Sequence, residues 1–420
     1  MFAQAGTLPR AMVPLGEYDW PSPPTEETLR RLWKGVVARV RRVPEGPFIA
    51  AEDLRTTSSN LLDDLAPPPH CEPFLQELAA ELEDWLAAPD AVIRTKLVIV
   101  PPCEDASTLQ AWAEREGLDR LRPPPRERLL DGDETTANGW TPDLAALQAP
   151  ADAPVLVVPR LEEWFLRHRN GLDAVRALLA AIDGSERRVV VGCNSWAWTY
   201  LAKAVEADMV MANARTFQAF DGPALRRWLH GLVHEPHGHA DAVRFRSAQT
   251  GDVLFEDEEQ DAALFETLAA QSLGIPWVAW HRWRRSLRTT REAEGAEHVE
   301  SVDRPDMDAR AKAPDGRRTV WVSPEAPPDL PDAHERTSLL ICHALLLHGG
   351  LTARELRTVL PEEGATPILA ALVARGFVQR RAPRGAGTNG GGDAVLRCRP
   401  GAYPTVRAEL SALGFPLDVL

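Results

Sequence analysis

Three short, mostly apolar runs constrain the fold of this chain most. They are Lys96–Val100 (KLVIV), Val155–Val158 (VLVV) and Arg188–Val191 (RVVV). None alternates apolar and polar residues, as expected of strands that are buried on both faces. The segments Ser107–Glu116 and Gly171–Ile182, which lie between these runs, read as helices. Strands separated by helices of this length favour an α/β fold with a parallel sheet and right-handed crossovers.

The length of 420 residues exceeds one ordinary core, so several domains are expected. A pair of helices is predicted over Gln260–Leu287, interrupted at Gly274–Pro276, and residues 289–318 read as a charged linker. The last part of the chain reads as three short helices and a two-stranded wing, the order of a winged helix-turn-helix. The predicted domains are an N-terminal helical extension (1–70, with a helix at Thr25–Arg42), a P-loop-ATPase-like core (71–240), a helical lid and linker (241–333) and a winged helix-turn-helix (334–420).

The composition indicates a soluble, cytoplasmic protein of bacterial type. A net charge of −14 argues against a protein that coats nucleic acid over its whole surface, although one basic face is compatible with it. The five cysteines form no CxxC pair, which fits a reducing compartment. No apolar N-terminal segment of signal type is present, and no apolar run approaches the roughly 20 residues of a membrane span.

The loop after the first strand lies where a P-loop ATPase binds the phosphates of its nucleotide. That site needs the pattern Gly-x4-Gly-Lys-[Ser/Thr] between a strand and a helix. The chain has Val100 and Asp105 in place of the two glycines, Ala106 in place of the lysine, and Ser107 as the terminal hydroxyl. A side chain at the glycine positions obstructs the close approach of backbone to phosphate. The loop therefore has the register of a phosphate-binding loop without its chemistry.

Two acids in the same loop oppose a bound nucleotide further. Glu104 and Asp105 place carboxylates where phosphate oxygens would lie, and Ala106 offers no compensating charge. Each such pair costs about 4 kcal/mol at roughly 4 Å with an effective dielectric near 20. This exceeds the roughly 0.3–1 kcal/mol that a helix N-terminus contributes to anion binding.

The ends of the other two strands carry weaker nucleotide-site candidates. Arg160, Glu162 and Glu163 follow Val155–Val158, where a Walker B strand presents its magnesium-binding acid. Solvated acids that open a helix are the favoured interpretation of the two glutamates. Asn194 ends the third strand, and either a γ-phosphate sensor or a helix N-cap suits it.

The order of these parts resembles the AAA+ and STAND class of P-loop ATPases over residues 72–420, most closely the archaeal origin-recognition type. The lid segment Ser272–Pro276 is similar to the S-x-G-x-P entry of that family's sensor 2 helix. The resemblance implies ATP-driven switching and an arginine on that helix near the nucleotide, for which Arg282, Arg284 and Arg285 are candidates. Because the Walker motifs are degenerate, we expect no ATP hydrolysis, no enzyme activity and neither ATP nor magnesium as a cofactor.

A histidine cluster is the one candidate metal site. The spacing of His230 and His234 puts both on one helix face, as a zinc site requires, and His237 and His239 follow in a loop. A solvated loop is the default interpretation, so no metal is assigned.

The predicted wing gives the strongest binding surface. The helix predicted before it, Pro367–Arg375, is nearly all apolar and offers little to a base edge, which favours contact with a protein over DNA.

We therefore expect a regulatory or scaffolding subunit of a larger cytoplasmic assembly. Alternatives are a DNA-binding winged-helix regulator whose ATPase-like core forms oligomers, and a nucleotide switch with an unorthodox site. The candidate contact residues are Arg375, Arg380, Arg381, Arg384, Arg397 and Arg399.

Overall fold

The computed structural model describes most of the chain as two compact units. The smaller unit comprises Met1–Leu8, Asp19–Pro69 and Ala219–Ala326, and the larger unit comprises Pro9–Tyr18, His70–Gln218 and Pro327–Leu420. The helix predicted at Thr25–Arg42 lies outside the described residues, and the four-part domain division stays a prediction. The described residues are 12–21, 49, 54–57, 62–63, 65–69, 72–88, 92–104, 107–130, 142–234, 243–290, 318–324, 328, 330, 335–361, 365–382 and 393–420.

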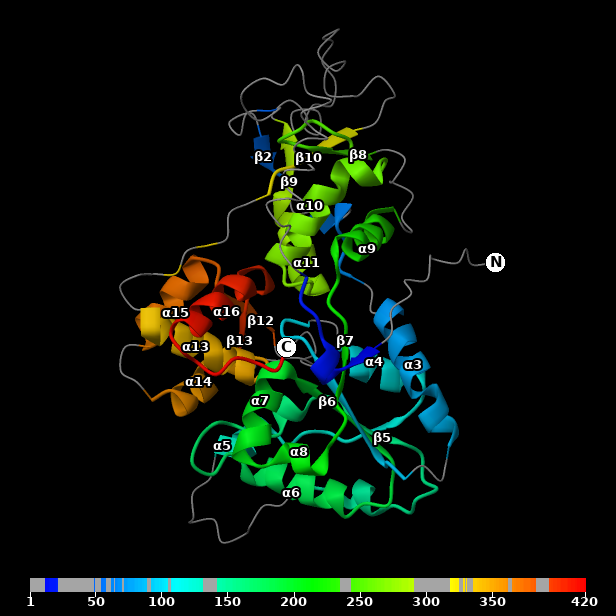
Figure 1. The fold of residues 1–420 in the computed structure, drawn as a ribbon. Helices are drawn as coiled ribbons and strands as arrows, with labels where there is room; N and C mark the ends of the chain where they lie inside the picture. The colour runs from blue at the N-terminus through cyan, green and yellow to red at the C-terminus, as the bar shows by residue number, and fades with distance from the viewer. Residues whose placement is uncertain are drawn as a thin grey trace, which may run out of the picture. The chain divides into compact units, whose positions relative to one another are not determined.

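A six-stranded sheet organises the larger unit (Figure 1). The strand that contains KLVIV, β3, lies inside the sheet and pairs in parallel with β6 and β7. Strand β1 alone in this sheet runs antiparallel, against β7. The predicted parallel core is thus confirmed. Across the sheet the strands are β1 (Met12–Pro14), β7 (Arg215–Phe217), β3 (Thr95–Val100), β6 (Val189–Asn194), β5 (Leu156–Val158) and β4 (Asp119–Arg120).

Helices and short turns flank this sheet. The central strands are buried throughout, as their unbroken apolar runs predict: Val189, Val190 and Val191 expose no surface. The flanking elements are α3 (Glu72–Ala87), α4 (Thr108–Arg115), α5 (Arg126–Leu130), α6 (Asp173–Asp183), α7 (Ser195–Ala204) and α8 (Ala207–Val210), with 3-10 turns η1 (Leu15–Glu17), η3 (Ala145–Gln148) and η4 (Leu161–Glu163).

The C-terminal region of the larger unit follows the predicted order of three helices and a hairpin. A short strand, β11, was not predicted; it pairs with β13, which also pairs with β12, and all pairs are antiparallel. Thr352 and Glu355 form a capping box that starts the second helix. The elements are α13 (Glu335–Leu347), β11 (Leu351–Thr352), α14 (Ala353–Val359), α15 (Ala365–Ala374), β12 (Val378–Arg381), β13 (Val395–Cys398), η8 (Pro400–Ala402) and α16 (Tyr403–Ala412).

The C-terminal region and the six-stranded sheet share one hydrophobic interior. Leu347 belongs to the same buried cluster as the side chains of β3, β5 and β6. On α7, the ring of Trp196 contacts His343 at 5.6 Å and Tyr403 at 6.5 Å between centroids. Removing the C-terminal region would therefore expose apolar surface of the core.

The smaller unit combines the predicted helix pair with a sheet that was not predicted. Residues Thr289, Thr290 and Arg318, assigned to a linker in the sequence, lie in strands. Trp277 and Trp283, six positions apart on α11, are both buried in the core of this unit. Across the sheet the strands are β2 (Leu54–Thr56), β9 (Leu287–Thr290), β10 (Arg318–Val322) and β8 (Val243–Ser247), and the helices are α9 (Gly222–His234), α10 (Glu258–Gln271) and α11 (Pro276–Ser286).

Within the described part of the chain, none of the helices is both long enough and apolar enough to cross a membrane.

Candidate functional site

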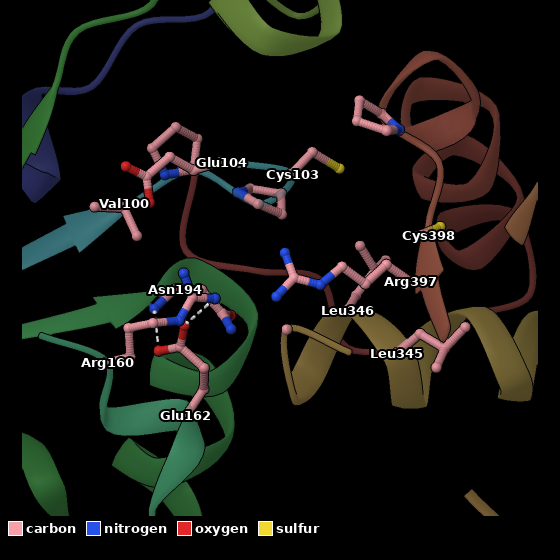
Figure 2. A pocket seen from close by; sticks show the side chains of 14 residues that line it. Val100, Cys103, Glu104, Arg160, Glu162, Asn194, Leu345, Leu346, Arg397 and Cys398 are labelled. Atoms are coloured by element: carbon pink, nitrogen blue, oxygen red, sulfur yellow. Dashed lines mark hydrogen bonds and ion pairs between the residues drawn. The ribbon is translucent and has the colours of Figure 1, made fainter. Parts of the chain in front are cut away.

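The carboxyl ends of β3, β5 and β6 surround a small cavity (Figure 2). Parallel strands end at the same edge of a sheet, and this edge is where open α/β sheets bind ligands. The strand ends contribute Glu104, Arg160, Glu162 and Asn194, so four of the predicted nucleotide-site residues do come together. From the C-terminal region, Arg397 of β13 points toward the strand ends.

At the end of β3, an acidic side chain binds the N-terminus of the helix that follows, α4. The Oε1 atom of Glu104 accepts a hydrogen bond from the backbone N–H of Thr108, the first residue of α4. A helix N-terminus carries unpaired N–H groups and a partial positive charge, which make it the usual phosphate position in this architecture. Ser107, at the N-cap, is left-handed with φ 51° and makes no side-chain cap hydrogen bond. Asp105 and Ala106 lie outside the described residues.

The second and third strand ends are joined by an ion-pair network. The Nη2 atom of Arg160 lies 2.9 Å from Oε1 of Glu162, and its Nε atom lies 3.2 Å from Oε1 of Glu163. The other oxygen of Glu162 accepts from the backbone N–H of Asn194 at 3.2 Å. Asn194 in turn caps α7, because its Oδ1 accepts from the N–H of Ala197 at 2.8 Å.

The interpretation of both glutamates as solvated acids is wrong for Glu162. Its side chain is only 1% exposed, whereas that of Glu163 is 31% exposed. A buried carboxylate needs a cation and hydrogen-bond donors to offset its desolvation. Arg160 supplies the cation, and the Asn194 N–H supplies the hydrogen-bond donor. Arg160 can reach Glu162 because it lies between the end of β5 and the start of η4.

A loop of the C-terminal region closes over this ion pair. Gly349 has φ +62°, and a Cβ atom built on it would lie 2.9 Å from Nη2 of Arg160. Its neighbour Gly350 has φ +123°, and a Cβ there would lie 2.8 Å from Cγ of Arg397. The positive φ of both residues favours glycine, and a side chain at Gly349 would have to displace the Arg160 guanidinium from its ion pair with Glu162. The two consecutive glycines after α13 are the signal in the sequence from which this contact could have been predicted.

Arg126 of α5 fastens the same loop to the core. It donates from Nη2 to the backbone oxygen of His348 at 3.1 Å and to that of Glu162 at 3.5 Å, and from Nη1 to that of Gly350 at 3.5 Å. Its guanidinium also lies 4.0 Å from Oε2 of Glu355. This arginine was not predicted, since no spacing in the sequence links it to residues more than 200 positions away.

The end of the described chain is tied to the residue after Asn194. Oγ of Ser195 donates to Oδ2 of Asp418 at 2.6 Å, and the hydroxyl of Tyr403 donates to the same oxygen at 3.3 Å. Nε of Arg407 lies 3.2 Å from Oδ1 of Asp418. Burial raises the pKa of Asp418, and the Arg407 charge opposes that shift. Burial likewise raises the pKa of the Tyr403 hydroxyl well above its ordinary value.

Two histidines at this contact are held neutral. Nε2 of His348 accepts from the backbone N–H of Arg167 at 3.3 Å. Burial lowers the pKa of His348 well below its ordinary value, and the charges of Arg126 and Arg167 lower it further. Burial, with the charge of Arg167, lowers the pKa of His343 to about 4.

The cavity is small, and two of the acidic side chains that line it are engaged by groups of the chain itself. Its volume is about 40 Å³, room for a few waters, whereas ligand pockets occupy roughly 300–1,000 Å³. Glu104 blocks the helix N-terminus, and Glu162 is engaged by Arg160. The described residues at this edge can therefore hold the C-terminal region, while a nucleotide would have to displace both it and the Glu104 carboxylate.

The remaining predicted residues lie elsewhere. Arg380 and Arg381 are on β12, Arg375 follows α15, and Arg399 follows β13, whereas Arg384 lies outside the described residues. Among the described candidate contact arginines, Arg397 lines the cavity.

Of the histidines, His230 and His234 are both on α9, where His230 packs against Phe255, and His237 and His239 fall outside the described residues. Among the residues that the structure describes, no group of three or more histidine, cysteine or acidic side chains could hold a metal ion.

Of the lid arginines, Arg284 pairs with Asp63 and Arg282 donates to Gln271, and Arg285 is exposed at the end of α11.

Comparisons with known proteins identify structural likeness only. No protein-family model matches the chain, and no curated protein matches it. The chain is similar to the solved structure of the Aeropyrum pernix ORC1 protein in complex with DNA, with 15% identity, a TM-score of 0.33 and coverage of 87% of this chain and 99% of that one. It is also similar to the Aeropyrum pernix ORC2 protein (12%, 0.35, 85% and 98%) and to Cdc6p from Pyrobaculum aerophilum (13%, 0.30, 85% and 98%).

Proposed function

We propose that this protein is a regulatory or scaffolding subunit with an ATPase-like core that does not hydrolyse ATP. The observation that carries the proposal is the use made of the two acids at the strand ends. Glu104 caps α4 where a phosphate would bind, and Glu162 is buried against Arg160 and the Asn194 N–H. Both groups that could serve a nucleotide and its magnesium are thus engaged in holding the fold.

The C-terminal region supports the same proposal from the other side of the cavity. The loop that contains Gly349 covers the Arg160–Glu162 pair, and Asp418 is bonded to Ser195 beside Asn194. A switch driven by nucleotide needs a site that gains and loses its ligand. Here the chain's own residues occupy that edge, which suits a permanently assembled module that binds partner proteins.

ATP turnover and binding test the proposal directly. The purified protein should show no magnesium-dependent ATP hydrolysis, and ATP with magnesium should leave its thermal unfolding midpoint unchanged, because a ligand that does not bind the native state cannot stabilise it. Turnover that disappears in Glu162→Gln or Ser107→Ala protein would overturn the proposal in favour of an unorthodox nucleotide switch.

DNA binding through the C-terminal hairpin is the second candidate function. Arg380 on β12 is exposed, and Arg381 adjoins it. If the hairpin contacts phosphates, R380A/R381A/R384A should weaken binding to every duplex alike and lower the salt slope by up to about three units. The matched control R122A/R128A/R176A removes three arginines from the sheet portion of the larger unit.

A protein partner gives a different pattern in the same variants. A tagged chain should recover a defined set of proteins from its host, and R380A/R381A/R384A should reduce that recovery while R122A/R128A/R176A does not. Tight, sequence-selective duplex binding by the full chain at physiological salt would replace the scaffold by the DNA-binding regulator, with oligomerisation through the core as its expected assembly.

A further inference from the structure

Two cysteines of the C-terminal region lie with their thiol groups in contact. Cys342 belongs to α13, Cys398 is the last residue of β13, and a hydrogen bond joins their side chains. Both side chains are buried, and neither forms a disulfide in this structure. The fold therefore brings together two sulfur atoms that lie far apart along the chain.

The packing of α13 against β13 holds these thiols in place. Cys398 pairs across the hairpin with Val378 of β12, which is buried. Leu345 and Leu346, one turn after Cys342 on α13, are buried as well. Close packing of this kind leaves side chains little freedom to move apart. The two sulfur atoms therefore stay adjacent in the folded protein.

Cys398 also faces the cavity at the strand ends, which Cys342 does not line. Figure 2 shows it on β13 beside Arg397. The cavity, of about 40 Å³, has room for a few waters. Pro101 and Glu104 of its wall keep part of their surface exposed, so solvent can reach it. Hydrogen peroxide is small enough to enter such a space, whereas a peptide disulfide such as oxidised glutathione is not.

The hydrogen bond between the thiols gives them different roles. It raises the pKa of Cys342 well above its ordinary value, and burial raises that pKa further. A hydrogen bond raises the pKa of a thiol when that thiol is the donor, because the bond stabilises the protonated form. The S–H group of Cys342 thus donates to the sulfur of Cys398. Cys398 is the sulfur that a molecule in the cavity meets first.

We propose that Cys342 and Cys398 are a peroxide-dependent disulfide site. In the first step the sulfur of Cys398 attacks one oxygen of hydrogen peroxide, the O–O bond breaks, and Cys398 becomes a sulfenic acid as one water leaves. In the second step the sulfur of Cys342 attacks that of Cys398 and the S–O bond breaks. The hydroxyl group leaves with the Cys342 proton as a second water. Two thiols and one peroxide thus give one disulfide and two waters.

The bond would fasten the helix that precedes the covering loop. Helix α13 leads into Gly349, which lies against the Arg160 guanidinium, and β13 carries Arg397 at the cavity. A disulfide between distant positions restricts the unfolded chain, so oxidation should raise the thermal unfolding midpoint by roughly 4–15 °C. In a reducing compartment such a bond is transient and responds to oxidant. The inference does not depend on the proposed scaffold function.

The test is treatment of the full chain with hydrogen peroxide, followed by thiol titration of the unfolded protein and peptide mapping without reductant. We expect the loss of two of the five thiols and one pair of peptides linked through Cys342 and Cys398. Dithiothreitol should restore both thiols and the original midpoint, because a disulfide is reducible whereas a sulfinic acid is not. Oxidised glutathione at the same concentration should form the bond more slowly, since the cavity excludes it.

Serine variants identify the sulfur atoms that take part. Cys342→Ser and Cys398→Ser should each yield no linked pair and no rise in midpoint. Cys103→Ser is the matched control, because Cys103 is a half-buried cysteine of the same cavity, and it should still yield the pair. The mapping of the unsubstituted chain decides the proposal even where a variant does not fold. The proposal fails if peroxide leaves Cys342 and Cys398 unlinked, if Cys398 links to Cys103 instead, or if oxidised glutathione forms the bond as fast as peroxide.

Discussion

Gly349 shows how much one residue contributes to the contact between the core and the C-terminal region. An alanine there must adopt φ +62° and place Cβ 2.9 Å from the Arg160 guanidinium. Gly117 has nearly the same φ, +65°, with nothing within 4 Å of the position a Cβ would take. Gly117→Ala should thus lower the free energy of unfolding by about 1–2 kcal/mol, the backbone cost alone. Gly349→Ala should cost about 1 kcal/mol more, because the added methyl group displaces the ion-paired Arg160 guanidinium; urea denaturation measures both costs, and equal values would contradict the close contact.

His343 gives the larger unit a predictable dependence on pH. Its pKa is about 4 in the folded protein and near 6.5 when unfolded, so the unfolded state binds more protons between these values. Stability should therefore fall as the pH falls from about 6.5 to about 4, by roughly 3 kcal/mol from this residue. His348 acts in the same direction. His343→Leu should reduce the slope of unfolding free energy against pH without abolishing it, and an unchanged slope would contradict the assignment.

At the scale of elements, α5 and the loop after α13 are joined by one side chain. Arg126→Ala removes the hydrogen bonds to the backbone oxygens of His348 and Gly350, and it leaves those buried acceptors unpaired. We expect a loss of about 1–3 kcal/mol and faster amide exchange across β11, measured by hydrogen–deuterium exchange. Arg128→Ala, an exposed arginine of the same helix, should change neither quantity. Equal exchange in the two variants would show that Arg126 does not hold the loop.

At the scale of the whole molecule, the larger unit should respond as one cooperative body. Arg407→Ala leaves the buried Asp418 carboxylate without its cation and should cost about 3 kcal/mol. Because Asp418 is bonded to Ser195, the first residue of α7, amide protection should fall in α7 as well as in α16. Protection of β10, in the smaller unit, is the internal reference and should not change. Loss of protection confined to α16 would mean that the C-terminal region opens alone.

The local elements of the sheet could be predicted from the sequence, because they depend on neighbouring residues. Unbroken apolar runs such as Val189–Val191 can only be stable between two covering layers, and helices must then cross between parallel strands. That the loop after β3 lacks the glycines and the lysine of a phosphate-binding loop can also be read directly from the sequence. The four-stranded sheet escaped prediction because its strands alternate polar residues with few apolar ones, and because β9 and β10 are separated by a charged stretch.

Only the tertiary structure decided which groups meet at the carboxyl ends of the parallel strands. The sequence shows Glu162 only as a charged residue, which is expected to face solvent. Its burial depends on Arg160, the Asn194 N–H and the covering loop at Gly349. Asp418, which accepts from Ser195, and His348, which accepts from Arg126, each lie more than 200 positions away from that donor in the chain. Hydropathy and spacing report on residues that are neighbours along the chain, whereas these pairings exist only because the parallel strand ends and the C-terminal region meet at one edge of the sheet.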